Sequence, residues 1–160
     1  MNKTRVILPG SYDPVTIGHL DIIKRAAEKY DEVYVVVFIN PDKEYAFSLE
    51  ERVKMLIIAT EEFSNVIVSY SLGLVIDYMR EHGIEKIIKG YRNETDLAYE
   101  QMQADWNLKH GGYETELWLS SPEYSAVSST AAREAIKSGA PLGDLLTRGV
   151  IDYINSKNED

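Results

Sequence analysis

The residues from Leu8 to His19 form the stretch of this sequence that is best suited to hold a phosphate. The segment reads Leu-Pro-Gly-Ser-Tyr-Asp-Pro-Val-Thr-Ile-Gly-His, and it lies between a short apolar run and a segment with helical spacing of its apolar residues. Glycine-bearing turns between a strand and a helix hold phosphates in α/β proteins, because free backbone amides and the helix dipole attract anions there. Gly10 lets a ligand approach the backbone closely, and Ser11 offers a hydroxyl.

A histidine at the start of the helix adds a hydrogen-bond donor to this turn. The positive end of the helix dipole disfavours a protonated imidazole, so we expect His19 to donate from a neutral ring. The pair Gly18-His19 alone is more often an ordinary turn with an incidental histidine. The complete segment is far more specific than that pair.

Three further segments place cations or hydroxyl groups where they could reach the same phosphates. Lys43 follows a buried-strand pattern, Lys89-Gly-Tyr-Arg92 puts two cations around a glycine, and Tyr124–Thr130 has three consecutive hydroxyls before a helix. Each of these signals alone is also explained by a solvated lysine, a solvated turn or a helix cap. Glu100 follows on the next helix and could face the same site, or it could be a surface residue.

The elements that must position these residues alternate between strands and helices. Apolar runs of strand length predict five strands, and apolar residues at helical spacing predict six helices. The predicted strands are Arg5–Leu8, Val33–Ile39, Val66–Tyr70, Glu85–Lys89 and Thr115–Leu119. The predicted helices are Gly18–Tyr30, one opened by the capping box Ser48–Glu51, Leu74–Glu81 with Gly83 as its C-cap, Thr95–Lys109 before Gly111-Gly112, one from Ser128 or Ser129 to Gly139, and Arg148–Ser156.

This alternation predicts a Rossmann-like α/β fold. We expect a doubly wound sheet of five parallel strands in the order 3-2-1-4-5, with helices on both faces. The length predicts one domain over residues 1–160, with a frayed polar tail at 157–160. Ligands of such sheets bind beyond the carboxyl ends of the strands, which is where the polar segments described above lie.

Composition excludes several classes of protein. The formal net charge of −9 argues against a nucleic-acid partner, which usually selects a basic surface. The absence of cysteine excludes disulfides and thiolate metal sites, and the three histidines are too far apart in sequence to suggest a metal cage. No apolar run approaches the roughly 20 residues that cross a bilayer. We therefore expect a cytoplasmic protein that binds neither nucleic acid nor membrane.

Taken together, these segments resemble the bacterial phosphopantetheine adenylyltransferases. That family belongs to the nucleotidyltransferase superfamily named for a Thr/His-x-Gly-His motif, which is present here as Thr16-Ile-Gly-His19. The resemblance extends in order along nearly the whole chain. The segments that carry it are Pro9–Pro14, Gly18-His19, Lys43, Ser48–Arg52, Gly90–Arg92, Tyr99-Glu100 and Val127–Thr130.

The resemblance implies an enzyme of coenzyme A biosynthesis. In this family, ATP and 4′-phosphopantetheine give dephospho-coenzyme A, a coenzyme A-type product, and pyrophosphate. The resemblance also implies Mg²⁺ that accompanies ATP without a protein side chain as ligand, and a homohexamer built as a dimer of trimers.

The resemblance further implies a role for each matching residue. The residues expected to act in catalysis are His19, Lys43, Lys89 and Arg92. The residues expected to bind phosphopantetheine are Ser11, Lys43, Val75 and Lys89. The residues expected to bind ATP are Ser11, Tyr12, His19, Gly90, Tyr91, Arg92, Glu100, Tyr124, Ser125, Ala126, Val127, Ser128, Ser129 and Thr130.

Four positions depart from the usual pattern of the family. Ser11 stands where threonine is common and Thr130 where serine is common, and both keep the hydroxyl. Ile17 replaces a frequent asparagine. Lys89 replaces an arginine, so a point charge replaces a two-pronged planar donor, which predicts looser binding of the phosphopantetheine phosphate.

Two other functions remain open at the level of sequence. A sister nucleotidyltransferase that uses CTP or nicotinamide mononucleotide would share the motif. A nucleotide-binding regulator would bind ATP without releasing pyrophosphate, although the presence of His19, Lys43 and Arg92 argues against it.

Overall fold

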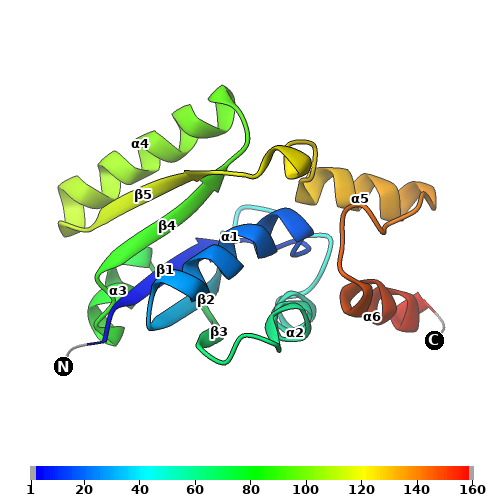
Figure 1. Ribbon diagram of the computed structural model, residues 1–160, viewed down its shortest axis with the longest axis horizontal. Coiled ribbons are helices and arrows are strands. Elements are labelled where there is room, and N and C mark those ends of the chain that lie inside the picture. The colour runs from blue at the N-terminus through cyan, green and yellow to red at the C-terminus, as the bar shows by residue number, and fades with distance from the viewer. Residues whose placement is uncertain (1–2, 159–160) are drawn as a thin grey trace.

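The computed structural model describes residues 3–158, and their strands form one five-stranded parallel sheet. The strand order is β3-β2-β1-β4-β5, which confirms the predicted doubly wound α/β fold. Figure 1 shows the strands running toward the end of the molecule where α5 lies. The strands are β1 Arg5–Gly10, β2 Glu32–Phe38, β3 Val66–Ser71, β4 Lys86–Tyr91 and β5 Glu114–Leu119.

Helices cover both faces of the sheet. One face packs against buried residues of α1, α2, α5 and α6, and the other packs against buried residues of α3. Side chains alternate across a strand, so the valine run of β2 supplies apolar groups to both layers. The helices are α1 Ile17–Lys29, α2 Leu49–Thr60, α3 Val75–His82, α4 Glu94–Gly111, α5 Ser129–Ser138 and α6 Arg148–Asn158, with a 3₁₀ turn at Pro122–Tyr124.

Capping chemistry fixes where these helices begin and end. Ser48 and Glu51 form the predicted capping box at α2, and Ser128 caps α5 through the backbone N–H of Ala131. Gly83 and Gly139 adopt the left-handed conformation at the ends of α3 and α5. Local sequence signals located three of these termini directly, and at the start of α5 the structure selects Ser128 over Ser129 as the cap.

Several element boundaries differ from the sequence prediction by one or two residues. β1 and β4 each extend two residues further, to Gly10 and Tyr91, because their backbones continue the parallel ladder with β2 and β5. The 3₁₀ turn after β5 was not predicted. α6 continues through Asn158, so the first two residues of the expected frayed tail are helical, and residues 159–160 lie outside the described part of the chain.

The central pair of strands separates early. β1 and β4 pair only at Val6 with Lys86 and at Ile7 with Ile87, whereas β1 stays paired with β2 as far as Gly10. This is the point where the strand order reverses, and crevices that bind ligands form there in doubly wound sheets. Beyond Ile7, the gap between β1 and β4 is bridged by a side chain, since Lys89 Nζ donates to the carbonyl of Pro9 at 3.1 Å.

No helix within residues 3–158 has the length and apolar character needed to cross a lipid bilayer.

Candidate active site

Two cavities meet above the gap between β1 and β4. The cavity beside α1 has a volume of about 570 Å³ and the cavity beside α4 about 450 Å³, and we call them the α1 cavity and the α4 cavity. Ile88 lines the α1 cavity and Ile87 lines the α4 cavity, because neighbouring residues of a strand face opposite sides of the sheet. The residues that line both cavities are Pro9, Gly10, Ser11, Lys43, Lys89, Tyr99 and Glu100.

The structure sorts the expected binding residues between these cavities. All four expected phosphopantetheine residues line the α4 cavity: Ser11, Lys43, Val75 and Lys89. Most of the expected ATP residues line the α1 cavity: Ser11, Tyr12, His19, Gly90, Arg92, Glu100, Val127, Ser128, Ser129 and Thr130. The other four, Tyr91, Tyr124, Ser125 and Ala126, line neither cavity. Ser11, Lys43 and Lys89 therefore stand at the junction.

His19 is held in one tautomer by the N-terminus of its own helix. The backbone N–H of Thr16 donates to His19 Nδ1 at 2.9 Å, and the His19 N–H donates to Thr16 Oγ1 at 3.2 Å. This reciprocal pair is a capping box in which histidine takes the usual place of glutamate. Because Nδ1 accepts a hydrogen bond, the proton of the neutral ring is on Nε2, which makes that atom a donor.

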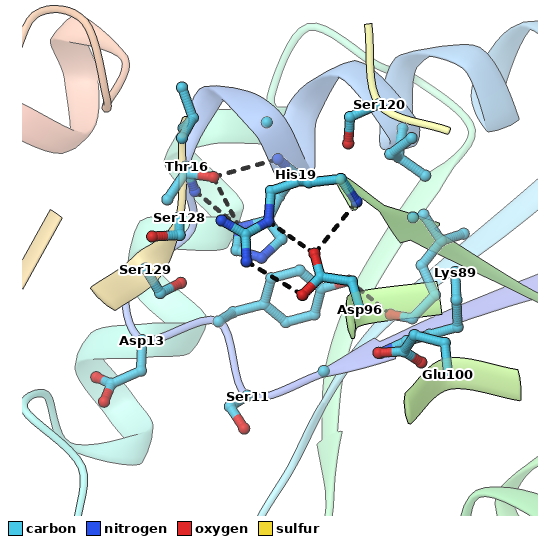
Figure 2. Close-up of a pocket in the computed structure, with 18 of the residues that line it drawn as sticks. Ser11, Asp13, Thr16, His19, Lys89, Asp96, Glu100, Ser120, Ser128 and Ser129 are labelled. Atoms are coloured by element: carbon cyan, nitrogen blue, oxygen red, sulfur yellow. Dashed lines mark hydrogen bonds and ion pairs between the residues drawn. The ribbon is translucent and has the colours of Figure 1, made fainter. Parts of the chain in front are cut away.

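The surroundings of His19 keep its ring neutral. Burial, followed by the positive charges of Lys89 and Arg92, lowers the pKa of His19 from 6.5 to about 4. The sequence predicted a neutral ring from the helix dipole, whereas the structure adds burial and two neighbouring cations as causes. Figure 2 shows Ser128 and Ser129 on one side of His19, and Lys89 and Glu100 on the other.

The lowered pKa of His19 makes a prediction for acid solution. Between pH 6.5 and about 4 the unfolded chain takes up a proton at His19 before the folded chain does, so the free energy of unfolding falls as pH drops through this window. An NMR titration of the folded protein should place the midpoint of the His19 ring near pH 4. A midpoint between pH 6 and 7 would contradict the arrangement described here.

Tyr12 forms the support beneath His19. Its backbone has a left-handed φ of 47°, its hydroxyl donates to the carbonyl of Leu8 at 2.8 Å, and its ring lies edge-on to the imidazole with centroids 4.9 Å apart. Burial raises the pKa of Tyr12, so the phenol remains a donor. A Cβ at Gly10 would lie 3.1 Å from this ring, which gives Gly10 a packing reason in addition to ligand approach.

Two buried charged residues join the loop that bears Lys43 to the first loop. The Asp13 carboxylate accepts the backbone N–H groups of Ala46 at 2.8 Å and Phe47 at 2.9 Å. Arg52 donates through Nη1 to the Ser11 carbonyl and through Nε to the Phe47 carbonyl, both at 3.1 Å. Asp13 and Arg52 are only 4% and 2% exposed, so the two loops are tied together beneath the surface.

The aromatic ring of Tyr45 supports the Lys43 side chain from the same loop. The guanidinium of Arg52 lies 3.9 Å from the centroid of this ring, and Lys43 Nζ lies 5.5 Å from it. The Tyr45 hydroxyl accepts the N–H of Asn40 at 2.9 Å. Lys43 thus projects from an organised loop.

Lys89 near the end of β4 and Arg92 just after β4 are paired with acidic residues of α4. Lys89 Nζ lies 3.5 Å from Glu100 Oε1, and Arg92 Nε donates to Asp96 Oδ2 at 2.9 Å. Both acids line the α1 cavity, so each cation is held at the site in the absence of substrate.

The hydroxyl-rich start of α5 is connected to the first loop. Ser128 caps the helix, whereas Ser129 Oγ donates to the Pro14 carbonyl at 2.8 Å. Arg133 donates to the Asp13 carbonyl at 2.8 Å and to Thr130 Oγ1 at 3.1 Å. Capping therefore accounts for one of the three hydroxyls, and the others help to close the wall of the α1 cavity.

Four functional neighbours of these residues were not predicted from the sequence: Asp13 and Arg52, which join the loops, and Asp96 and Arg133, which line the α1 cavity. Helical spacing could have indicated one of them, because Arg133 is three residues after Thr130 in a predicted helix. Asp96 is four residues after Arg92, but Arg92 precedes the helix, so helical spacing does not indicate this pair. The roles of Asp13 and Arg52 depend on contacts between distant loops.

Mg²⁺ would find few protein ligands at this site. Within residues 3–158 no group of three or more His, Cys, Asp or Glu side chains is arranged to hold a metal ion. The two acids of the cavity that follow Lys89 and Arg92, Asp96 and Glu100, are already paired with these cations. This donor set fits a Mg²⁺ ion that receives most of its ligands from a phosphate chain and water.

Comparisons with known proteins show the family of this chain and its shared fold. A model of the cytidylyltransferase-like family matches residues 7–135. A phosphopantetheine adenylyltransferase from Corynebacterium diphtheriae is 42% identical over 154 residues, which cover 96% of this chain and 97% of that protein. The crystal structure of a candidate nicotinate-nucleotide adenylyltransferase from Vibrio parahaemolyticus has a TM-score of 0.71 at 16% identity, covers 97% of this chain and 93% of its own, and shows the shared fold. This chain belongs to the phosphopantetheine adenylyltransferase family of cytidylyltransferase-like proteins.

Proposed function

We propose that this single nucleotidyltransferase domain transfers the adenylyl group of ATP to 4′-phosphopantetheine, giving dephospho-coenzyme A and pyrophosphate. The observation that carries the proposal is the junction of two cavities at Ser11, Lys43 and Lys89, beside the neutral donor His19. A site for a reaction between two phosphorylated substrates needs a space for each and cations where their phosphates meet. The family relationship supports the choice of these two substrates.

The nucleophile is the phosphate of phosphopantetheine. Its second pKa is about 6, so it is largely dianionic at neutral pH and needs no general base. One of its oxygens forms a bond to the α-phosphorus of ATP as the bond from that phosphorus to the oxygen bridging to the β-phosphate breaks. Pyrophosphate leaves with the electron pair of the broken bond.

The chain then acts by positioning and by electrostatic stabilisation. Lys43 and Lys89 neutralise the incoming phosphate at the junction, and His19 Nε2–H donates to the α-phosphate, where negative charge develops. Arg92 and the start of α5 hold the β- and γ-phosphates. Bound Mg²⁺ would neutralise charge on the leaving pyrophosphate, with phosphate oxygens and water as its principal ligands.

Pyrophosphate release tests this proposal directly. With ATP and Mg²⁺, phosphopantetheine should release pyrophosphate, whereas nicotinamide mononucleotide and glycerol phosphate (the latter with CTP as well) should not. Release with either of those acceptors would identify a sister nucleotidyltransferase. ATP binding without release for any acceptor would identify a regulator and contradict the proposed reaction.

Lys89 is expected to govern affinity for phosphopantetheine. Lys89→Ala should raise KM for phosphopantetheine more than KM for ATP, because the proposal assigns this cation, which lines both cavities, to the phosphopantetheine phosphate. Lys89→Arg should leave this KM unchanged or lower it, since guanidinium binds phosphate through two donors. Steady-state kinetics with each substrate varied in turn measures both. A rise in KM for ATP alone would contradict the assignment of Lys89 to phosphopantetheine. Lys43→Ala provides a second test, because Lys43 also lines both cavities.

We also propose a cytoplasmic homohexamer arranged as a dimer of trimers. Large apolar side chains are exposed on α4 and around the end of β3, a pattern that supports burial between subunits. Sedimentation equilibrium tests the assembly, and a monomer would contradict it. The exposed residues concerned are Tyr99, Met102, Trp106 and Leu108 on α4, and Tyr70, Leu72 and Leu74 around the end of β3.

A further inference from the structure

We propose that Asp96 is a positioning residue that holds one edge of the Arg92 guanidinium so that its other edge faces the polyphosphate of ATP. The inference rests on the proposed function and deepens it, because it assigns a role to an acidic residue inside an anion-binding cavity. An acid in such a place calls for an explanation, since it would repel phosphate if its charge were not compensated.

The contacts between the two side chains are specific to one edge of the guanidinium. Arg92 Nε donates to Asp96 Oδ2 at 2.9 Å, and Arg92 Nη2 donates to Asp96 Oδ1 at 3.3 Å. Figure 2 marks bonds to the Asp96 carboxylate with dashed lines. A guanidinium has five N–H donors, so the edge formed by Nη1 and Nη2 keeps donors for a bidentate contact to phosphate.

The backbone fixes the carboxylate that holds Arg92. Asn93 caps α4 by accepting the N–H of Asp96 at 2.9 Å, and Asp96 Oδ2 also accepts the N–H of Arg92 at 3.2 Å. A carboxylate in the first turn of a helix is further stabilised by the helix dipole. The turn from β4 into α4 and the arginine side chain are therefore ordered by the same carboxyl group before ATP binds.

Arg92 lines the same cavity as His19, the proposed donor to the α-phosphate. Arg92 is close enough to His19 for its charge to contribute to the lowered pKa of that ring. The neighbouring cation Lys89 has its own acidic partner, Glu100, so Asp96 serves Arg92 alone among these charges. Without Asp96, Arg92 would keep its charge but lose the contacts that restrict its rotamers, and ATP binding would bear that ordering cost.

A double-mutant cycle on ATP binding tests this inference. Calorimetry with ATP and Mg²⁺ should show that Asp96→Ala weakens binding about tenfold, the scale of coupling within one hydrogen-bonded network. In the Arg92→Ala background the same change should no longer weaken binding, because no guanidinium remains to be positioned, and removal of the then uncompensated Asp96 charge should favour ATP. Kinetic KM for ATP should rise in parallel, with little change in KM for phosphopantetheine.

Asp77→Ala provides a matched control. Asp77 is also in the first turn of its helix, α3, and pairs with an arginine, Arg80 at 3.5 Å, yet it lines neither cavity. This variant should leave ATP binding unchanged. If Asp96→Ala fails to fold, Asp96→Asn replaces it, since the isosteric amide keeps one acceptor and should give a smaller loss in the same direction.

Three results would overturn the inference. Equal losses from Asp96→Ala with and without Arg92 would show that Asp96 acts independently of that arginine. Tighter ATP binding by Asp96→Ala or Asp96→Asn would show that Asp96 competes with phosphate. A rise in both KM values together would indicate a general structural role. Failure of the unmodified protein to use phosphopantetheine contradicts the proposed acceptor but leaves this ATP-binding cycle informative, whereas failure to bind ATP contradicts both.

Discussion

Replacing His19 by alanine is expected to lower the turnover of adenylyl transfer by about 10²–10³, the usual cost of removing one donor to a developing negative charge. The structure explains why this single donor has a large effect. Its ring is neutral and its Nδ1 is occupied by the Thr16 N–H, so Nε2–H is fixed as a donor before the reaction begins. Because charge on the α-phosphate increases in the transition state, the loss should appear in kcat more than in KM.

Initial rates of pyrophosphate release at saturating ATP and phosphopantetheine measure this effect. His82→Ala is the matched control, because His82 is also a helical histidine and lines neither cavity. It should retain the activity of the unmodified protein. A change of less than threefold for His19→Ala would remove His19 from the proposed transition state.

Replacing Asp13 by alanine is expected to lower the free energy of unfolding by about 2–4 kcal/mol. The change leaves two backbone N–H groups, those of Ala46 and Phe47, without their acceptor, and each unsatisfied buried group costs about 1–3 kcal/mol. Urea unfolding followed by circular dichroism measures the loss. The loop that bears Lys43 is released by the same change, so KM for phosphopantetheine should also rise.

Asp42→Ala separates this effect from a simple change of net charge. Asp42 is in the same loop and is exposed, so its substitution should shift the free energy of unfolding by no more than about 0.5 kcal/mol. If Asp13→Ala were as stable as Asp42→Ala, the two hydrogen bonds would contribute nothing to holding the loops together. Asp13→Asn should lie between the two, since one amide oxygen cannot accept both N–H groups as well as a carboxylate.

The sequence predicted much of the fold because its signals are local. The valine run of β2, the capping box at Ser48 and Glu51, and the glycines that end α3 and α5 each act within a few residues. Alternation of strands and helices then restricts the topology, and the observed strand order confirms it. The polar segments at the strand ends were predicted to lie together because the carboxyl ends of parallel strands meet at one edge of the sheet. Most of these segments line the two cavities.

The rest of the site depends on contacts that are distant in sequence. Nothing near Arg52 indicates that its guanidinium donates to the Ser11 carbonyl, and nothing near Asp13 indicates that it accepts from Phe47. The lowered pKa of His19 likewise arises chiefly from burial, which sequence spacing does not give. The sequence predicted Lys89 as a phosphate-binding cation with a solvated turn as the alternative, but it did not indicate the partners that the structure provides, Glu100 and the carbonyl of Pro9.

The early separation of β1 from β4 affects how rigid the sheet is between these two strands. The sheet is least continuous where its two halves join, and beyond Ile7 and Ile87 the Lys89 side chain spans the gap by donating to the carbonyl of Pro9. Phosphates bound to both Lys89 and the loop after β1 would connect the two halves of the sheet across this gap. Substrates would then stiffen the protein in the direction perpendicular to its strands, and amide hydrogens near the ends of β1 and β4 should exchange more slowly when both are bound.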